Sequence, residues 1–123
     1  MLVNEVEVEN FKSIKHVKLK CKRINIFIGE PNTGKSNLIE AIVGLPSLFY
    51  YNPSRFGNDP KSFIRFDKIS SIYYDNNLED EIKILANIKD GLSFKILISF
   101  RDGHYYCNAQ ASNWQLNISC LLY

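Results

Sequence analysis

The sequence lacks any apolar run near the roughly 18 residues that a membrane-spanning helix needs, and it opens on the acidic stretch MLVNEVEVEN. We therefore expect a cytoplasmic protein with no membrane partner. Cysteines are few: Cys21, Cys107 and Cys120 are an odd number with no CxxC spacing. This pattern fits neither a disulfide framework nor a common zinc site, so reduced thiols are expected.

A strong charge of one sign is also absent, because 15 Lys and Arg are nearly balanced by 13 Asp and Glu. A net charge of +2 does not by itself indicate nucleic-acid binding. Hydrophobic content of 46% and charged content of 23% are typical of a globular protein. A chain of 123 residues is one domain or part of one, so we treat residues 1–123 as a single unit.

Residues 1–23 predict an antiparallel β-hairpin that turns through FKSI. In VNEVEVEN and HVKLKCKR, apolar and charged residues alternate with the period of a half-buried strand. One register places the glutamates of the first strand opposite the lysines of the second and pairs apolar residues on the other face. The predicted pairs are Glu9 with Lys18, Glu7 with Lys20, Glu5 with Lys22, Val8 with Leu19 and Val6 with Cys21. Ion pairing is favoured over the alternative, a lysine stripe that contacts nucleic acid.

Residues 24–45 predict a strand, a loop and a helix. The run Ile24, Ile26, Phe27 and Ile28 is typical of a strand buried on both faces. From Lys35, apolar residues recur at helical spacing up to a stop at Gly44 and Pro46. Residues 46–80 predict an irregular, aromatic-rich connection. Residues 81–110 predict a three-stranded meander, because Asp90-Gly91 and Asp102-Gly103 each separate strand-like runs and suit tight turns.

The loop itself, GEPNTGKS, fits the phosphate-binding pattern GxxxxGK[ST] between a predicted strand and helix. Glycines allow backbone N–H groups to turn inward and form a nest for phosphates at a helix N-terminus. Lys35 would reach the β- and γ-phosphates, and Ser36 would ligate Mg²⁺. The predicted ligands are therefore ATP and Mg²⁺, and the predicted binding residues are Gly29, Glu30, Pro31, Asn32, Thr33, Gly34, Lys35, Ser36 and Asn37. The alternative is a glycine-rich turn with an exposed lysine.

The segments ENFKSIKHVKLK and INIFIGEPNTGKSNLIEAI resemble the N-terminal segment of SMC/RecF-type ATPases, including the AAA-like ATPases of OLD nucleases, which have ABC-type heads. The resemblance is close over residues 1 to about 45. It implies that Phe11-Lys12-Ser13 lies beside the nucleotide, where Lys12 can contact phosphates or ribose. A plain hairpin-turn lysine is the alternative. The resemblance implies a P-loop fold of class α/β, here an incomplete N-terminal lobe with a mixed, largely antiparallel sheet and one helix.

Several parts of such a head are missing from the sequence. The nearest candidates for a Walker B carboxylate, Asp67 and Asp75, follow interrupted apolar runs; there is no signature motif, and Gln110 is a weak Q-loop candidate. We therefore predict an ATP-binding N-terminal part with little or no hydrolysis of its own. In complete form it would serve DNA repair, recombination or maintenance, with a head-to-head dimer or a complementary C-terminal half as partner. The alternatives are a stand-alone or split nucleotide-binding module and a transporter-type ABC ATPase fragment.

Overall fold

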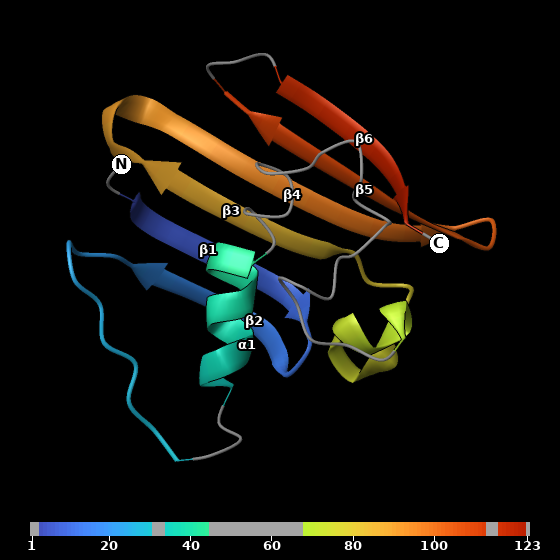
Figure 1. The fold of residues 1–123 in the computed structure, drawn as a ribbon, viewed down its shortest axis with the longest axis horizontal. Helices are drawn as coiled ribbons and strands as arrows, with labels where there is room; N and C mark the ends of the chain where they lie inside the picture. The colour runs from blue at the N-terminus through green and yellow to red at the C-terminus, as the bar shows by residue number, and fades with distance from the viewer. Residues whose placement is uncertain (1–2, 31–33, 45–67, 113–115, 123) are drawn as a thin grey trace.

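The structure is a computed structural model that describes residues 3–30, 34–44, 68–112 and 116–122. These residues form one twisted six-stranded sheet with a short helix and two helical turns against it (Figure 1). The strand order is β2-β1-β3-β4-β5-β6, and all five pairings are antiparallel. The strands are β1 (Val3–Phe11), β2 (Ile14–Lys20), β3 (Ile82–Ile88), β4 (Leu92–Arg101), β5 (His104–Ala111) and β6 (Leu116–Leu122). The described sheet is therefore antiparallel throughout, whereas a mixed sheet was predicted.

Alternation along the strands gives the sheet one buried face. The helical segment α1 (Lys35–Ile39) and η1 (Glu40–Gly44) packs on this face, as does the 3₁₀ turn η4 (Ile69–Ile72), which a second 3₁₀ turn, η5 (Tyr74–Asn76), follows (Figure 1). Ala41 of η1 and Ile72 of η4 belong to the same buried cluster as the strand residues. The buried strand residues are Val6, Val8, Phe11, Ile82, Ile84, Ile96, Ile98, Cys107 and Ala109.

The hairpin of β1 and β2 is confirmed, but its predicted register is wrong by two residues. Phe11 pairs with Ile14, so that only Lys12 and Ser13 form the turn, and Lys12 has a φ of 51°. The observed pairs are Glu5 with Lys20, Val6 with Leu19, Glu7 with Lys18, Val8 with Val17 and Glu9 with His16. A shift of two preserves the faces, since side chains alternate with period two. Alternation alone therefore could not distinguish the two registers.

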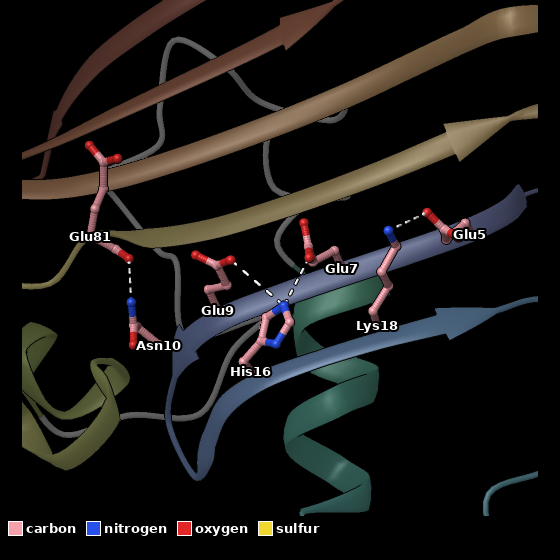
Figure 2. A network of polar contacts seen from close by, with 7 residues as sticks. All are labelled: Glu5, Glu7, Glu9, Asn10, His16, Lys18 and Glu81. Atoms are coloured by element: carbon pink, nitrogen blue, oxygen red, sulfur yellow. Dashed lines mark hydrogen bonds and ion pairs between the residues drawn. The ribbon is translucent and has the colours of Figure 1, made fainter.

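The predicted polar face is present with other partners, as Figure 2 shows. Lys18 lies 3.5 Å from Glu5, diagonally across the strands. His16 lies 2.8 Å from a carboxylate oxygen of Glu7 and 3.7 Å from one of Glu9. The donor atoms of these last three residues all lie within 4.8 Å of one another. The hydrogen bond between His16 and Glu7 brings these two side chains together.

The predicted meander is confirmed as β3, β4 and β5. Asp102 and Gly103 form a two-residue turn between Arg101 and His104, and both have positive φ, as predicted. The other connection is one residue longer, because Ile88 pairs with Leu92 around Lys89–Gly91. Two pairings were not predicted: β1 with β3, which joins the hairpin to the meander, and β5 with β6.

The predicted buried strand over residues 24–28 is wrong. This segment has no regular secondary structure, and Ile24, Ile26 and Ile28 are 80%, 77% and 91% exposed. A strand needs hydrogen-bonded neighbours, and none of the described pairings includes this segment. The side chains that suggested burial therefore form an exposed apolar run.

The predicted helix after the loop is confirmed, because α1 and η1 together extend from Lys35 to Gly44. Of the predicted irregular connection 46–80, residues 46–67 lie outside the described residues, and residues 68–80 contain η4 and η5. No helix among the described residues is long and apolar enough to cross a membrane.

Candidate functional site

The two ends of the predicted phosphate-binding loop (Gly29–Ser36) differ in structure. Gly29 and Glu30 end the exposed segment, whereas Gly34 directly precedes α1 with a φ of 91°. This left-handed conformation suits glycine, because a Cβ would be strained there. Pro31, Asn32 and Thr33 lie outside the described residues. Gly34 therefore makes the sharp change of direction that begins the helix.

The Lys35 side chain reaches the first two residues of the loop. Its ammonium group donates hydrogen bonds to the carbonyl oxygen of Gly29 and, at 3.1 Å, to that of Glu30. The side chain thus spans the loop from its helical end to its first residues. Two carbonyl oxygens are partners that an ammonium group can exchange for the oxygens of an anion.

Ser36 and Asn37 lie in the first turn of α1. Ser36 is exposed, so its hydroxyl is accessible to a ligand. Asn37 donates a hydrogen bond of 2.7 Å from Nδ2 to the Ser13 hydroxyl. The first N–H groups of a helix have no intrahelical partner, and the helix dipole adds partial positive charge there. This end of α1 is therefore suited to an anion.

The hairpin turn (Lys12 and Ser13) lies between the helix and the 3₁₀ turns (Figure 1). Its backbone is anchored at Lys12, whose N–H donates to the Ile72 carbonyl at 2.7 Å, and Phe11 forms a β-bridge with Tyr73. The Lys12 ammonium forms an ion pair with Glu40 of η1. Burial raises the pKa of the Tyr73 phenol well above its usual range, so this side chain is neutral.

The structure therefore places the helical end of the loop, at Gly34, next to Ser13 of the hairpin turn. Glu40, the partner of Lys12, was not predicted. The sequence did place Glu40 near the predicted site, one helical turn beyond Ser36, because residues four apart lie on the same face of a helix. The sequence did not reveal how the hairpin would meet that face.

The Walker B candidates gain no support from the structure. Asp75 is exposed in η5 with a φ of 54°, rather than at the end of a buried strand. Asp67 lies outside the described residues. Gln110 is exposed on β5, in a pairing with Lys95 and Asn117. A carboxylate that positions the attacking water is thus not identified within the described part of the chain.

Comparison with known proteins identifies the family of the chain. Residues 1–119 match the AAA ATPase domain family, so the chain belongs to that family. It is 26% identical over 104 residues to an ATP/GTP phosphatase of Helicobacter pylori, a match that covers 80% of this chain and 28% of the relative. It is 40% identical over 68 residues to the DNA replication and repair protein RecF of Staphylococcus aureus, covering 54% of this chain and 17% of RecF.

These matches confirm the predicted resemblance to SMC/RecF-like AAA ATPases. The matched part of the chain, however, spans only 28% of the first relative's length and 17% of the second's. What those whole proteins do is therefore not transferred directly to this chain.

Proposed function

We propose that this chain binds ATP with Mg²⁺ through the phosphate-binding loop, as the nucleotide-binding part of an SMC/RecF/OLD-like AAA ATPase. The observation that carries the proposal is the position of Lys35 at the start of α1, where its ammonium group donates hydrogen bonds to the carbonyl oxygens of Gly29 and Glu30 at the other end of the loop. The left-handed Gly34 and the exposed Ser36 at the start of α1 add the glycine and the hydroxyl that the phosphate-binding pattern requires.

In this proposal each group has a separate task. The N–H groups at the start of α1 donate to phosphate oxygens, and Lys35 exchanges the Gly29 and Glu30 carbonyls for oxygens of the β- and γ-phosphates. The Ser36 hydroxyl ligates Mg²⁺, which neutralises phosphate charge when bound. Pro31, Asn32 and Thr33 contribute the middle of the loop.

Binding without turnover is the expected behaviour of the isolated chain. Hydrolysis needs a group that positions the attacking water and charges that stabilise the transition state, in addition to a phosphate cradle. In a longer or assembled form, the name of the RecF relative, a DNA replication and repair protein, favours work on DNA. Dimerisation of two such heads is proposed from the family resemblance alone.

A second candidate is a split nucleotide-binding module that a separate polypeptide completes. The exposed apolar run favours it, because four neighbouring apolar side chains, those of Ile24, Ile26, Phe27 and Ile28, are 40% to 91% exposed. Co-expression with a segment corresponding to the uncovered part of a relative would test this candidate. Co-purification with restored phosphate release would support it, and separate elution without phosphate release would count against it.

The direct test of the proposed function is calorimetric titration of ATP and Mg²⁺ into the chain, a Lys35→Ala variant and a Lys15→Ala control. Lys15 is an exposed lysine on β2, outside the loop. Loss of a charge-assisted contact of about 1.5–3 kcal/mol should weaken binding about tenfold to a hundredfold in Lys35→Ala. Lys15→Ala should bind like the unmodified chain. Equal binding by all three proteins, or none by the unmodified chain, would contradict the proposal.

A further inference from the structure

We propose that Lys12 acts on nucleotide binding through Glu40, as a positioning residue that holds the start of the helix, with Lys35 and Ser36, against the hairpin turn. The proposal rests on the proposed function above. The family resemblance implies that Lys12 contacts the phosphates or ribose of the nucleotide. In the present proposal the Lys12 ammonium group instead pairs with the Glu40 carboxylate of the helix.

The Lys12–Glu40 ion pair is well shielded from water. The side chains of Lys12 and Glu40 are only 13% and 11% exposed. The ammonium group also lies 5.8 Å from the centre of the buried Phe11 ring. In such surroundings, a charge that loses its partner is costly, so each residue constrains the other.

Lys12 is itself firmly placed. Its N–H donates to the Ile72 carbonyl at 2.7 Å, and its φ of 51° fixes the tight turn between β1 and β2. Because the Lys12 backbone is anchored to the sheet and to η4, the ion pair with Glu40 holds η1 at a fixed place relative to both.

The hairpin turn contacts the helix at two further levels. Ser13 accepts a hydrogen bond from Asn37, and a Cβ placed on Gly34 would lie 3.1 Å from the Ser13 hydroxyl oxygen. Gly34, Asn37 and Glu40 are three residues apart in sequence, which places them along one side of the helix. The turn thus contacts one row of the helical segment, from Gly34 directly before it to Glu40 in its second turn.

This row of contacts determines where the loop groups can be. Lys35 and Ser36 lie between Gly34 and Asn37, so a movement of the helix relative to the hairpin would displace both of them. Groups that bind a ligand have to be held close to their productive geometry for full affinity. Loss of the Lys12–Glu40 pair should therefore weaken ATP binding even where Lys12 touches no part of the nucleotide.

Charge exchange separates this positioning role from direct contact. We would titrate ATP and Mg²⁺ into Lys12→Glu, Glu40→Lys and the double variant that carries both changes. Each single change places two like charges together and should lower affinity about tenfold, whereas the double variant should recover to within about threefold of the unmodified chain. A double variant as weak as Lys12→Glu would overturn the proposal and favour direct contact.

A matched control is available on the same hairpin. Lys18 and Glu5 are 3.5 Å apart, but their side chains are 58% and 27% exposed, and they lie on the polar face (Figure 2). Exchange of these two charges should leave ATP affinity unchanged, because exposed pairs contribute little. An equal loss in the control would show a general effect of charge on the hairpin and would also overturn the proposal.

Folding is checked by thermal melts of every variant. Where a charge reversal fails to fold, Lys12→Met, Glu40→Gln and their double variant replace it. The positioning role predicts that the double variant binds no more weakly than the worse single variant, and additive losses would contradict it. If the unmodified chain binds no ATP, the proposed function itself fails; if it binds but neither cycle shows coupling, only the positioning role fails.

Discussion

Two isoleucine-rich regions of this chain differ in burial: one is in the core and the other is exposed to solvent. Ile82 and Ile84 of β3 and Ile96 and Ile98 of β4 are at most 1% exposed, whereas Ile24, Ile26 and Ile28 are at least 77% exposed. Both regions favour strands by composition. The difference is the partner: β3 is hydrogen-bonded on both sides, by β1 and β4, whereas none of the described pairings includes residues 24–28. Pairing and burial, rather than local propensity, therefore determine which of the two becomes a strand.

The largest change in stability is expected from one substitution in the buried region, compared with one in the exposed region. Ile84→Ala should lower the free energy of unfolding by about 2–5 kcal/mol, because it removes fully buried methyl groups and leaves a cavity. Ile28→Ala should change it by no more than about 0.5 kcal/mol. Urea unfolding followed by circular dichroism measures both. Similar losses would mean that residues 24–28 are packed in solution.

At the junction of loop and helix, Gly34→Ala should cost about 1–2 kcal/mol, because an L-residue is strained at a φ of 91°. Gly103→Ala is the matched control, with a φ of 78° and no atom within 4 Å of the added Cβ. The extra loss in Gly34→Ala over the control measures the close approach of Ser13. Gly34→Ala should also weaken ATP binding, whereas Gly103→Ala should not; equal effects on both measurements would contradict this account of the junction.

A smaller effect, of opposite sign, is expected at Tyr73. Its hydroxyl is buried and has no hydrogen-bond partner among the described residues. Tyr73→Phe removes that desolvated group and keeps the ring that packs 6.1 Å from Tyr105. The free energy of unfolding should therefore stay the same or rise by up to about 1 kcal/mol. A clear loss in urea unfolding would reveal a partner for the hydroxyl.

The smallest expected effect concerns pH and the polar face. The hydrogen bond with His16 holds the pKa of Glu7 below its usual value, with help from the charges of Lys83 and Lys18. A lowered pKa in the folded state contributes stability above the unfolded-state pKa, and this contribution is lost as pH falls through the folded-state pKa. The free energy of unfolding of the unmodified chain should therefore exceed that of Glu7→Gln, and the difference should be larger at about pH 5.5 than at about pH 3. Unfolding at both pH values measures this, and His16→Ala should remove most of the difference; a difference independent of pH would contradict it.

Local patterns predicted the elements whose determinants are local. Alternation identified β1 and β2, Asp102-Gly103 identified a turn, and the spacing after Lys35 identified the helix. The register of the hairpin depended instead on a two-residue turn that alternation cannot reveal. The pairing of β1 with β3 joins segments about 80 residues apart, with no local signal.

The same division applies to the candidate site. The loop residues follow one another in the sequence, so a motif of eight positions identified them. Glu40 was missed because its role depends on which face of the helix meets the hairpin turn. The exposure of residues 24–28 was unpredictable for the same reason, since burial requires a neighbour that the segment itself does not specify.

Phosphate binding by the loop can be measured residue by residue by nuclear magnetic resonance of the ¹⁵N-labelled chain, titrated with ATP and Mg²⁺ and, as a matched ligand without phosphates, adenosine. ATP is expected to shift the amide signals of Gly34, Lys35 and Ser36, with smaller changes at Lys12 and Ser13, while the signals of β3 to β5 remain in place. Adenosine should leave the amide signals of the loop unchanged. Absence of shifts with ATP, or equal shifts with adenosine, would contradict the claim that this loop binds phosphates.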